Sequence, residues 1–181
     1  MSTPVAVLLL LSSLSLDRPA VAQDPQEIPS CDQNRDYQVL DFWVGEWDVF
    51  VGDRLVGHNL IEKTLAGCAV IEHWTAAGGG QGRSLFYYAP HFDGWRQVWV
   101  TENVAAPGGL KEKREVAAPA EGSVRFQGDI RLPDGSTYLD HTTLTPLANG
   151  EVRQHIEVSG DQGTSWRTTF DAIYRRAAET R

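Results

Sequence analysis

The chain has 181 residues, a length that suits one domain or at most a small pair of domains. Its hydrophobic fraction of 41% and charged fraction of 22% are typical of an ordinary globular protein. A net charge of −8 argues against a nucleic-acid partner, because binding to phosphates requires clustered Lys and Arg side chains.

An apolar run near the N-terminus predicts a secretory signal peptide. Residues 5–16 are apolar over a length too short for a bilayer span, which requires about 20 residues. Pro19 and the small-x-small sequence at 20–22 follow, as is typical of a cleavage site. We expect residues 1–22 to be removed and residues 23–181 to form one periplasmic or extracellular domain without a membrane anchor. A buried core helix is the alternative.

The chain has two cysteines, Cys31 and Cys68. In an exported protein an even pair predicts a disulfide, which here would join the N-terminal segment to the third expected strand. Two unpaired thiols are the alternative. The two cysteines lack the close spacing of a zinc site, so they predict no metal.

The rest of the chain predicts antiparallel β-structure preceded by one short helix. Residues 34–43 have a helical pattern, with Asn34 as a candidate N-cap. Asp-Gly, Asn-Gly and other Gly-rich turns then separate short alternating segments, and such turns are strong hairpin signals. Ten strands are expected, at residues 47–51, 58–64, 68–76, 83–89, 95–102, 109–116, 123–132, 136–144, 151–159 and 165–175.

Ten short strands joined by hairpins fit either a β-sandwich or a closed up-and-down barrel. The even succession of hairpins favours the barrel, which has no exposed sheet edge and can hold one ligand inside. We therefore predict an all-β fold, a ten-stranded antiparallel up-and-down barrel.

Several segments resemble a family of secreted bacterial proteins of unknown function, lipocalin-like in the broad calycin sense. The likeness begins with FWVGEWDV at residues 42–49 and continues through GCAVIEHW, WRQVWV, EVRQHIEVSGDQGTSW and FDAIY. It covers almost the whole mature chain, from about Cys31 to Arg175. The resemblance implies a calycin-like barrel and brings no established activity.

In calycins, a Gly-x-Trp sequence at the start of the first strand closes the barrel, with an Arg from the last strand against the indole. Gly45 and Trp47 match this pair, and the resemblance implies that Arg175, or alternatively Arg176, supplies the guanidinium. Such a cation–π contact contributes about 0.5–2 kcal/mol. We expect a structural role for these residues, while Trp43 is expected either to complete this floor or to contact a ligand.

A ligand site is expected among side chains that share strand faces. Because side chains alternate along a strand, Glu72 and Trp74 share one face, and so do Gln97 and Trp99. Aromatic side chains with a few polar groups are typical of small-molecule sites. The alternative for each tryptophan is core packing, and the sequence leaves the inward face open. The predicted ligand-binding residues are Trp43, Asn59, Glu72, Trp74, Gln97 and Trp99.

Two acids, Glu72 and Asp171, lie among apolar neighbours. If Glu72 points inward, burial would raise the pKa of its carboxyl and suit it to general acid or base chemistry. The alternative is an ion pair with a strand arginine such as Arg114 or Arg153. The charged segment 111–115 is expected to be a solvated strand with cross-strand ion pairs.

The five histidines lack the local spacing of a zinc site, so no metal is expected. Some ten-stranded calycins hold haem through one strand histidine, and His141 or His155 could serve in that way. A lone strand histidine is more often a surface residue, so we expect no cofactor.

Three functions fit this sequence. The favoured one is an exported barrel that binds a small, partly apolar molecule in its interior. The second is a cofactor-free isomerase or cyclase that uses Glu72 or Asp171. The third is a protein-interaction module with a filled core and no cavity. This ranking of the three functions rests on fold analogy, and on that basis we expect a binding protein rather than an enzyme.

Overall fold

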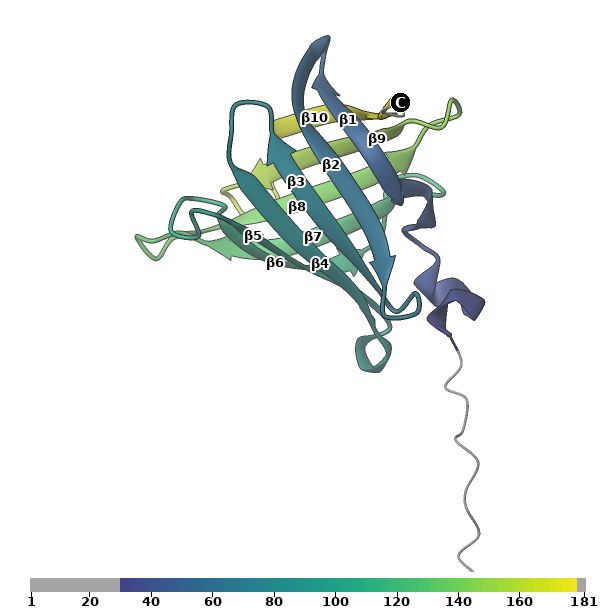
Figure 1. Ribbon diagram of the computed structural model, residues 1–181. Coiled ribbons are helices and arrows are strands. Elements are labelled where there is room, and N and C mark those ends of the chain that lie inside the picture. The colour runs from purple at the N-terminus through teal and green to yellow at the C-terminus, as the bar shows by residue number, and fades with distance from the viewer. Residues whose placement is uncertain (1–29, 179–181) are drawn as a thin grey trace, which may run out of the picture.

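The computed structural model describes residues 30–178, and the expected signal peptide at residues 1–22 lies outside them. Ten antiparallel strands form one closed barrel, in which each strand pairs with the next and β10 pairs with β1 (Figure 1). The predicted ten-stranded up-and-down barrel is therefore confirmed. The strands are β1 (Gly45–Val51), β2 (Arg54–Thr64), β3 (Ala69–Ala76), β4 (Gln81–Ala89), β5 (Gly94–Thr101), β6 (Leu110–Val116), β7 (Val124–Arg131), β8 (Thr137–Pro146), β9 (Val152–Ser159) and β10 (Arg167–Arg176).

The N-terminal segment forms short 3₁₀ turns instead of the single helix that the sequence predicts over residues 34–43. Leu40 and Trp43 are fully buried, and Tyr37 packs against the core. These three side chains are spaced by three residues, and the succession of short turns brings all of them toward the barrel. Across residues 30–178, every helix is too short or too polar to traverse a bilayer. The turns are η1 (Cys31–Gln33), η2 (Arg35–Tyr37), η3 (Asp41–Trp43) and, between β4 and β5, η4 (Pro90–Phe92).

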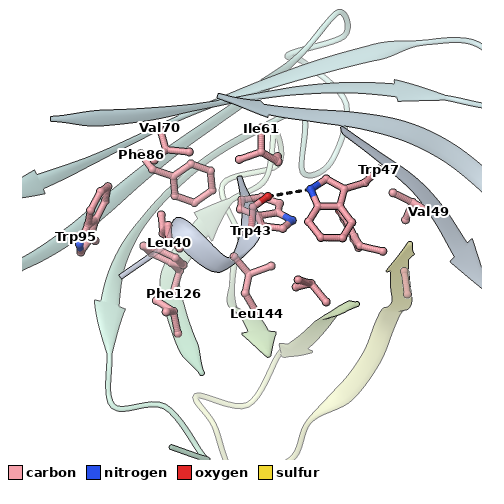
Figure 2. Close-up of a cluster of buried hydrophobic side chains, with 14 residues drawn as sticks. Leu40, Trp43, Trp47, Val49, Ile61, Val70, Phe86, Trp95, Phe126 and Leu144 are labelled. Carbon is pink, nitrogen blue, oxygen red and sulfur yellow. Dashed lines mark hydrogen bonds between the residues drawn. The ribbon is translucent and has the colours of Figure 1, made fainter. Parts of the chain in front are cut away.

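The N-terminal turns close one end of the barrel (Figure 1). Figure 2 shows Trp43 in the middle of the apolar side chains at this end, with Trp47 Nε1 donating to the Trp43 carbonyl at 2.8 Å. The Trp43 ring lies edge-on to Phe86 and Tyr174, with centroids 5.6 and 5.9 Å away. We call this cluster the plug. It consists of Leu40, Trp43, Trp47, Val49, Ile61, Val70, Phe86, Trp95, Val124, Phe126, Leu144, Val152, Ala172 and Tyr174.

The guanidinium that covers Trp47 belongs to Arg176, which corrects the assignment of this role to Arg175. Arg176 Cζ lies 3.9 Å from the centroid of the Trp47 ring, and its Nη1 donates to the Val44 carbonyl at 2.8 Å. Trp47 lies directly opposite Arg176 in the β1–β10 register, whereas Arg175 is one residue earlier and lies on the outer face. Gly45 has a φ of +135°, and a Cβ there would lie 1.8 Å from Arg176 Nη1, so glycine is required.

A disulfide between Cys31 and Cys68 ties η1 to the loop between β2 and β3, as the sequence predicts. Lys63 near the end of β2 strengthens the same attachment. Its Nζ lies 2.9 Å from Asp32 Oδ1 and 2.7 Å from Asp41 Oδ1. The disulfide and the two ion pairs hold η1 and η3 against the barrel wall.

Replacing Cys31 and Cys68 together by serine should lower the free energy of unfolding by about 2–4 kcal/mol, because the cross-link restricts the unfolded chain. Urea denaturation followed by tryptophan fluorescence measures the change. Reduced wild-type protein should match the double variant, and reductant should leave the variant unaffected. An unchanged urea midpoint would show that the Lys63 ion pairs hold the segment without the disulfide.

Candidate functional site

A cavity of ≈ 280 Å³ lies inside the barrel next to the plug, with which it shares Tyr174. Its volume is close to the lower end of the range of about 300–1,000 Å³ found for drug-sized ligands. Side chains from β3, β5, β6, β8, β9 and β10 form its walls. The lining residues are Glu72, Trp74, Gln97, Trp99, Lys111, Lys113, Thr142, Gln154, Ile156, Thr169, Phe170 and Tyr174.

Two tryptophans, Trp74 and Trp99, line the cavity, and each packs across a glycine of a neighbouring strand. A Cβ at Gly57 would lie 2.4 Å from Trp74 Cη2, and a Cβ at Gly82 would lie 2.2 Å from Trp99 Cη2. Phe170 lies edge-on to Trp74, with the ring centroids 6.5 Å apart. The two glycines therefore let the indoles lie close to the wall and leave the space between them open.

The Glu72 carboxylate lies inside the barrel, where the residue is 4% exposed. Asn59 Nδ2 donates to its Oε1 at 2.7 Å, and Ser84 Oγ donates to its Oε2 at 2.6 Å. Burial raises the pKa of Glu72, and the two hydrogen bonds and the charge of Lys113 offset only part of this effect. Glu72 is thus a buried carboxyl held by neutral hydrogen-bond donors.

Hydrogen bonds continue from Glu72 around the barrel in both directions. Gln97 Nε2 donates to Ser84 Oγ at 3.2 Å, while Gln97 Oε1 is buried without a hydrogen-bond partner among the described residues. In the other direction, Asn59 Nδ2 lies 3.2 Å from the Tyr174 hydroxyl, which donates to Gln154 Oε1 at 2.8 Å. A buried amide end without a partner is costly, so the free end of the Gln97 side chain favours a bound molecule with a complementary polar group.

Side chains of β6 and β8, the two strands that flank β7, form a buried charge cluster. Lys111 Nζ donates to Asp140 Oδ2 at 2.6 Å, and Lys113 Nζ donates to Asp140 Oδ1 and to Thr142 Oγ1. Burial alone would raise the pKa of Asp140, but the two lysines lower it. Burial lowers the pKa of Lys113 to about 8, despite the opposing charge of Asp140. The cluster therefore pairs two lysine side chains with one carboxylate.

The structure places four of the predicted ligand-binding residues, Glu72, Trp74, Gln97 and Trp99, in the cavity wall. Asn59 is buried behind this wall and holds Glu72 in place. Trp43 is corrected: it is fully buried in the plug and does not line the cavity. It lies in η3, before β1 begins, so the alternation of side chains along a strand does not apply to it.

The sequence did not reveal Lys111 and Lys113, which were expected on a solvated strand. Their spacing of two residues places both on one face of β6, and that face points into the barrel. Lys111 lies opposite Trp99 in the β5–β6 register, and Lys113 lies opposite Gln97. This pairing with two predicted cavity residues could have placed both lysines in the cavity wall, but it requires knowledge of the strand register.

The two histidines considered as haem ligands lie on the outer face of the barrel. His141 stacks on Trp166 with ring centroids 3.8 Å apart, and its Nε2 lies 2.7 Å from Gln127 Oε1. His155 Nε2 lies 2.9 Å from Thr168 Oγ1. Neither histidine lines the cavity. Within the described part of the chain, no group of three His, Cys, Asp or Glu side chains is placed to hold a metal ion.

No protein-family model matches this chain, and no curated protein matches it. The resemblance to secreted calycin-like proteins therefore stays a prediction.

Raising the pH should destabilise the fold through Glu72. Because its pKa is raised above the ordinary value of 4.5, the folded protein keeps a proton that the unfolded chain releases. The contribution of Glu72 to the free energy of unfolding is therefore fully present below pH 4.5 and is lost as the pH rises through the higher folded-state pKa. Glu72→Gln is neutral at every pH, so the stability of this variant relative to wild type should increase as the pH rises from 4.5 through the folded-state pKa of Glu72. Urea midpoints measured across the pH range will show this increase.

Asp171→Asn is the matched control. Asp171 lies on the outer face, and the Arg153 guanidinium 2.7 Å away lowers its pKa below 3.8. Its contribution to stability is therefore present above pH 3.8 and is lost as the pH falls, which is the opposite trend. If Glu72→Gln keeps a constant difference from wild type at every pH, the carboxyl of Glu72 is not protonated preferentially in the folded state.

Proposed function

We propose that this protein binds one small, partly apolar molecule inside its barrel. The cavity of ≈ 280 Å³ combines aromatic side chains with convergent polar groups, as ligand sites do. Gln97 carries the proposal, because its side chain lines the cavity, the residue is 5% exposed, and its Oε1 is left without a partner among the described residues. The same cavity weighs against an interaction module with a filled core.

We also propose that the protein is exported to the periplasm or beyond the cell. The disulfide between Cys31 and Cys68 supports this, because disulfides persist in oxidising compartments. The apolar run at residues 5–16 supports it independently.

Native mass spectrometry of the protein purified from a bacterial periplasm tests both proposals. The intact mass should correspond to a chain that begins at Gln23 and contains one disulfide. A second species should carry the additional mass of a small molecule. A chain that keeps residues 1–22 would contradict export by this signal.

Two glycine variants link the retained molecule to the cavity. Gly82→Ala adds a methyl group 2.2 Å from Trp99 Cη2, which should push the indole into the cavity and abolish the retained mass. Gly78→Ala is the matched control, because no atom lies within 4 Å of its added Cβ. Equal retention by wild type and both variants would place the molecule outside the cavity and overturn the proposal.

The buried Glu72 favours a second candidate, a cofactor-free isomerase or cyclase in which this carboxyl moves a proton on the bound molecule. A carboxyl with a raised pKa in a partly apolar cavity is suited to that task. Incubating the isolated ligand with wild type and with Glu72→Gln tests the idea. Conversion by wild type alone would support catalysis, and recovery of unchanged ligand from both would leave binding as the function.

A further inference from the structure

The cavity has a polar wall and a more apolar wall. β5 and β6 contribute Gln97, Lys111 and Lys113 to the polar wall. The more apolar wall contains Ile156 and the edge-on pair Trp74 and Phe170, and β9 and β10 also contribute the polar side chains Gln154, Thr169 and Tyr174. A molecule that fills the cavity therefore meets the two lysines on one wall and the Trp74–Phe170 pair on another.

The two lysines carry more N–H groups than their partners accept. Each ammonium has three N–H donors. Among the described residues, Lys111 donates to Asp140 alone, whereas Lys113 donates to Asp140 and Thr142. Three N–H groups are thus left for another acceptor. One carboxylate offsets only one of the two ammonium groups, so this wall carries an excess of one positive charge.

Glu72 leaves this charge uncompensated when it is protonated, the form that burial favours. With a proton on Oε2, its hydrogen bond to Ser84 reverses, and the Ser84 hydroxyl is free to donate to Gln97. A 180° rotation of the Gln97 amide then turns its NH₂ group to the cavity. Gln97 lies opposite Lys113 in the β5–β6 register, so its NH₂ group joins the ammonium groups on one wall of donors.

We propose that the ligand is a small carboxylic acid bound as its anion, with the carboxylate against Lys111, Lys113 and Gln97 and an apolar body against Trp74 and Phe170. This inference rests on the proposed function. Hydrogen bonds from ammonium to carboxylate are about twice as strong as neutral ones, and they also neutralise the excess charge. The volume of ≈ 280 Å³ limits the acid to a small one.

Three probes of nearly equal shape separate charge from shape. Phenylacetate is an anion, phenylacetamide is neutral and 2-phenylethylamine is a cation at neutral pH. Quenching of tryptophan fluorescence, checked by calorimetry, gives their dissociation constants. Phenylacetate should bind most tightly, the amide about tenfold or more weakly, and the amine most weakly.

Variants on β6 assign the charge effect to the lysines. Lys111→Met should weaken phenylacetate binding about tenfold and leave the amide nearly unchanged, because Lys113 still pairs with Asp140. Lys111→Arg should keep the preference for the anion. Arg114→Met is the matched control, because it removes a positive charge from an exposed position of the same strand. It should change neither constant.

Several results would overturn this inference. Equal or tighter binding of the amide contradicts the role of charge, and equal weakening of anion and amide by Lys111→Met shows that the lysine only shapes the cavity. Failure of all three probes to quench fluorescence at millimolar concentration also overturns it. If native mass spectrometry then identifies a retained neutral or cationic molecule, the proposed binding function stands and only the acid is rejected.

Discussion

Trp43→Ala should lower the free energy of unfolding by about 3–5 kcal/mol, the range found when a buried aromatic side chain is truncated. The indole is fully buried and lies edge-on to Phe86 and Tyr174. Its removal leaves a cavity in the middle of the plug, where side chains from different walls of the barrel are in contact. Urea denaturation followed by circular dichroism gives the change.

Two further tryptophan variants calibrate this measurement. Trp166→Ala removes a half-buried indole that stacks on His141 at the outer face, so it should cost much less. Trp43→Phe should also cost less than Trp43→Ala, because it keeps a ring in the plug and removes an indole N–H that is buried without a partner among the described residues. Equal losses for Trp43→Ala and Trp166→Ala would show that the plug is not the main source of stability.

Asp140→Leu should destabilise the protein by about 3–5 kcal/mol, because it leaves the Lys113 ammonium buried without its counter-ion. The side chains of Asp140 and Lys113 are 0% and 2% exposed, so both charges are removed from bulk water and depend on each other. Chemical denaturation at neutral pH measures the loss. Asp129→Ala, at an exposed position of neighbouring β7, should change stability by no more than about 0.5 kcal/mol.

The double variant Asp140→Leu/Lys113→Met tests the cause of that loss. Replacement of a complete buried ion pair by apolar side chains is often neutral, so the double variant should be more stable than Asp140→Leu alone. Lys111, with a side chain that is 16% exposed, can reach water at the edge of the cavity. A double variant as unstable as Asp140→Leu would show that the loss comes from packing around residue 140 and not from the unpaired ammonium.

The sequence predicts the barrel because its signals are local. Gly-containing turns, Asp-Gly and Asn-Gly among them, and a period of two mark the hairpins without any knowledge of the partners across the barrel. All ten expected strands overlap the observed ones. The helix expected over residues 34–43 is the exception. Burial of Leu40 and Trp43 favours three residues per turn, and this burial depends on contacts that form only in the assembled plug.

The site was harder to predict because it depends on register. A shift of one residue moves a side chain to the opposite face of a strand, and this separates Arg176 over Trp47 from Arg175 on the outer face. Glu72 and Trp74 could be paired by alternation along one strand. Lys111 and Lys113 could be assigned to the cavity only from the alignment of β5 with β6, because a run of charged residues by itself indicates a solvent-exposed strand.

The pairing of β1 with β10 sets the order in which this chain can fold. Trp47 meets Arg176 across this ladder, so the first strand has no second neighbour until the last strand has been made. Contacts between the two ends of a chain slow folding, because a long loop must close before they form. Until then β1 and the last completed strand expose open edges that can pair with other chains. A chain still bound to the ribosome therefore carries an incomplete barrel, and loss of the final strand would leave a sheet prone to aggregation.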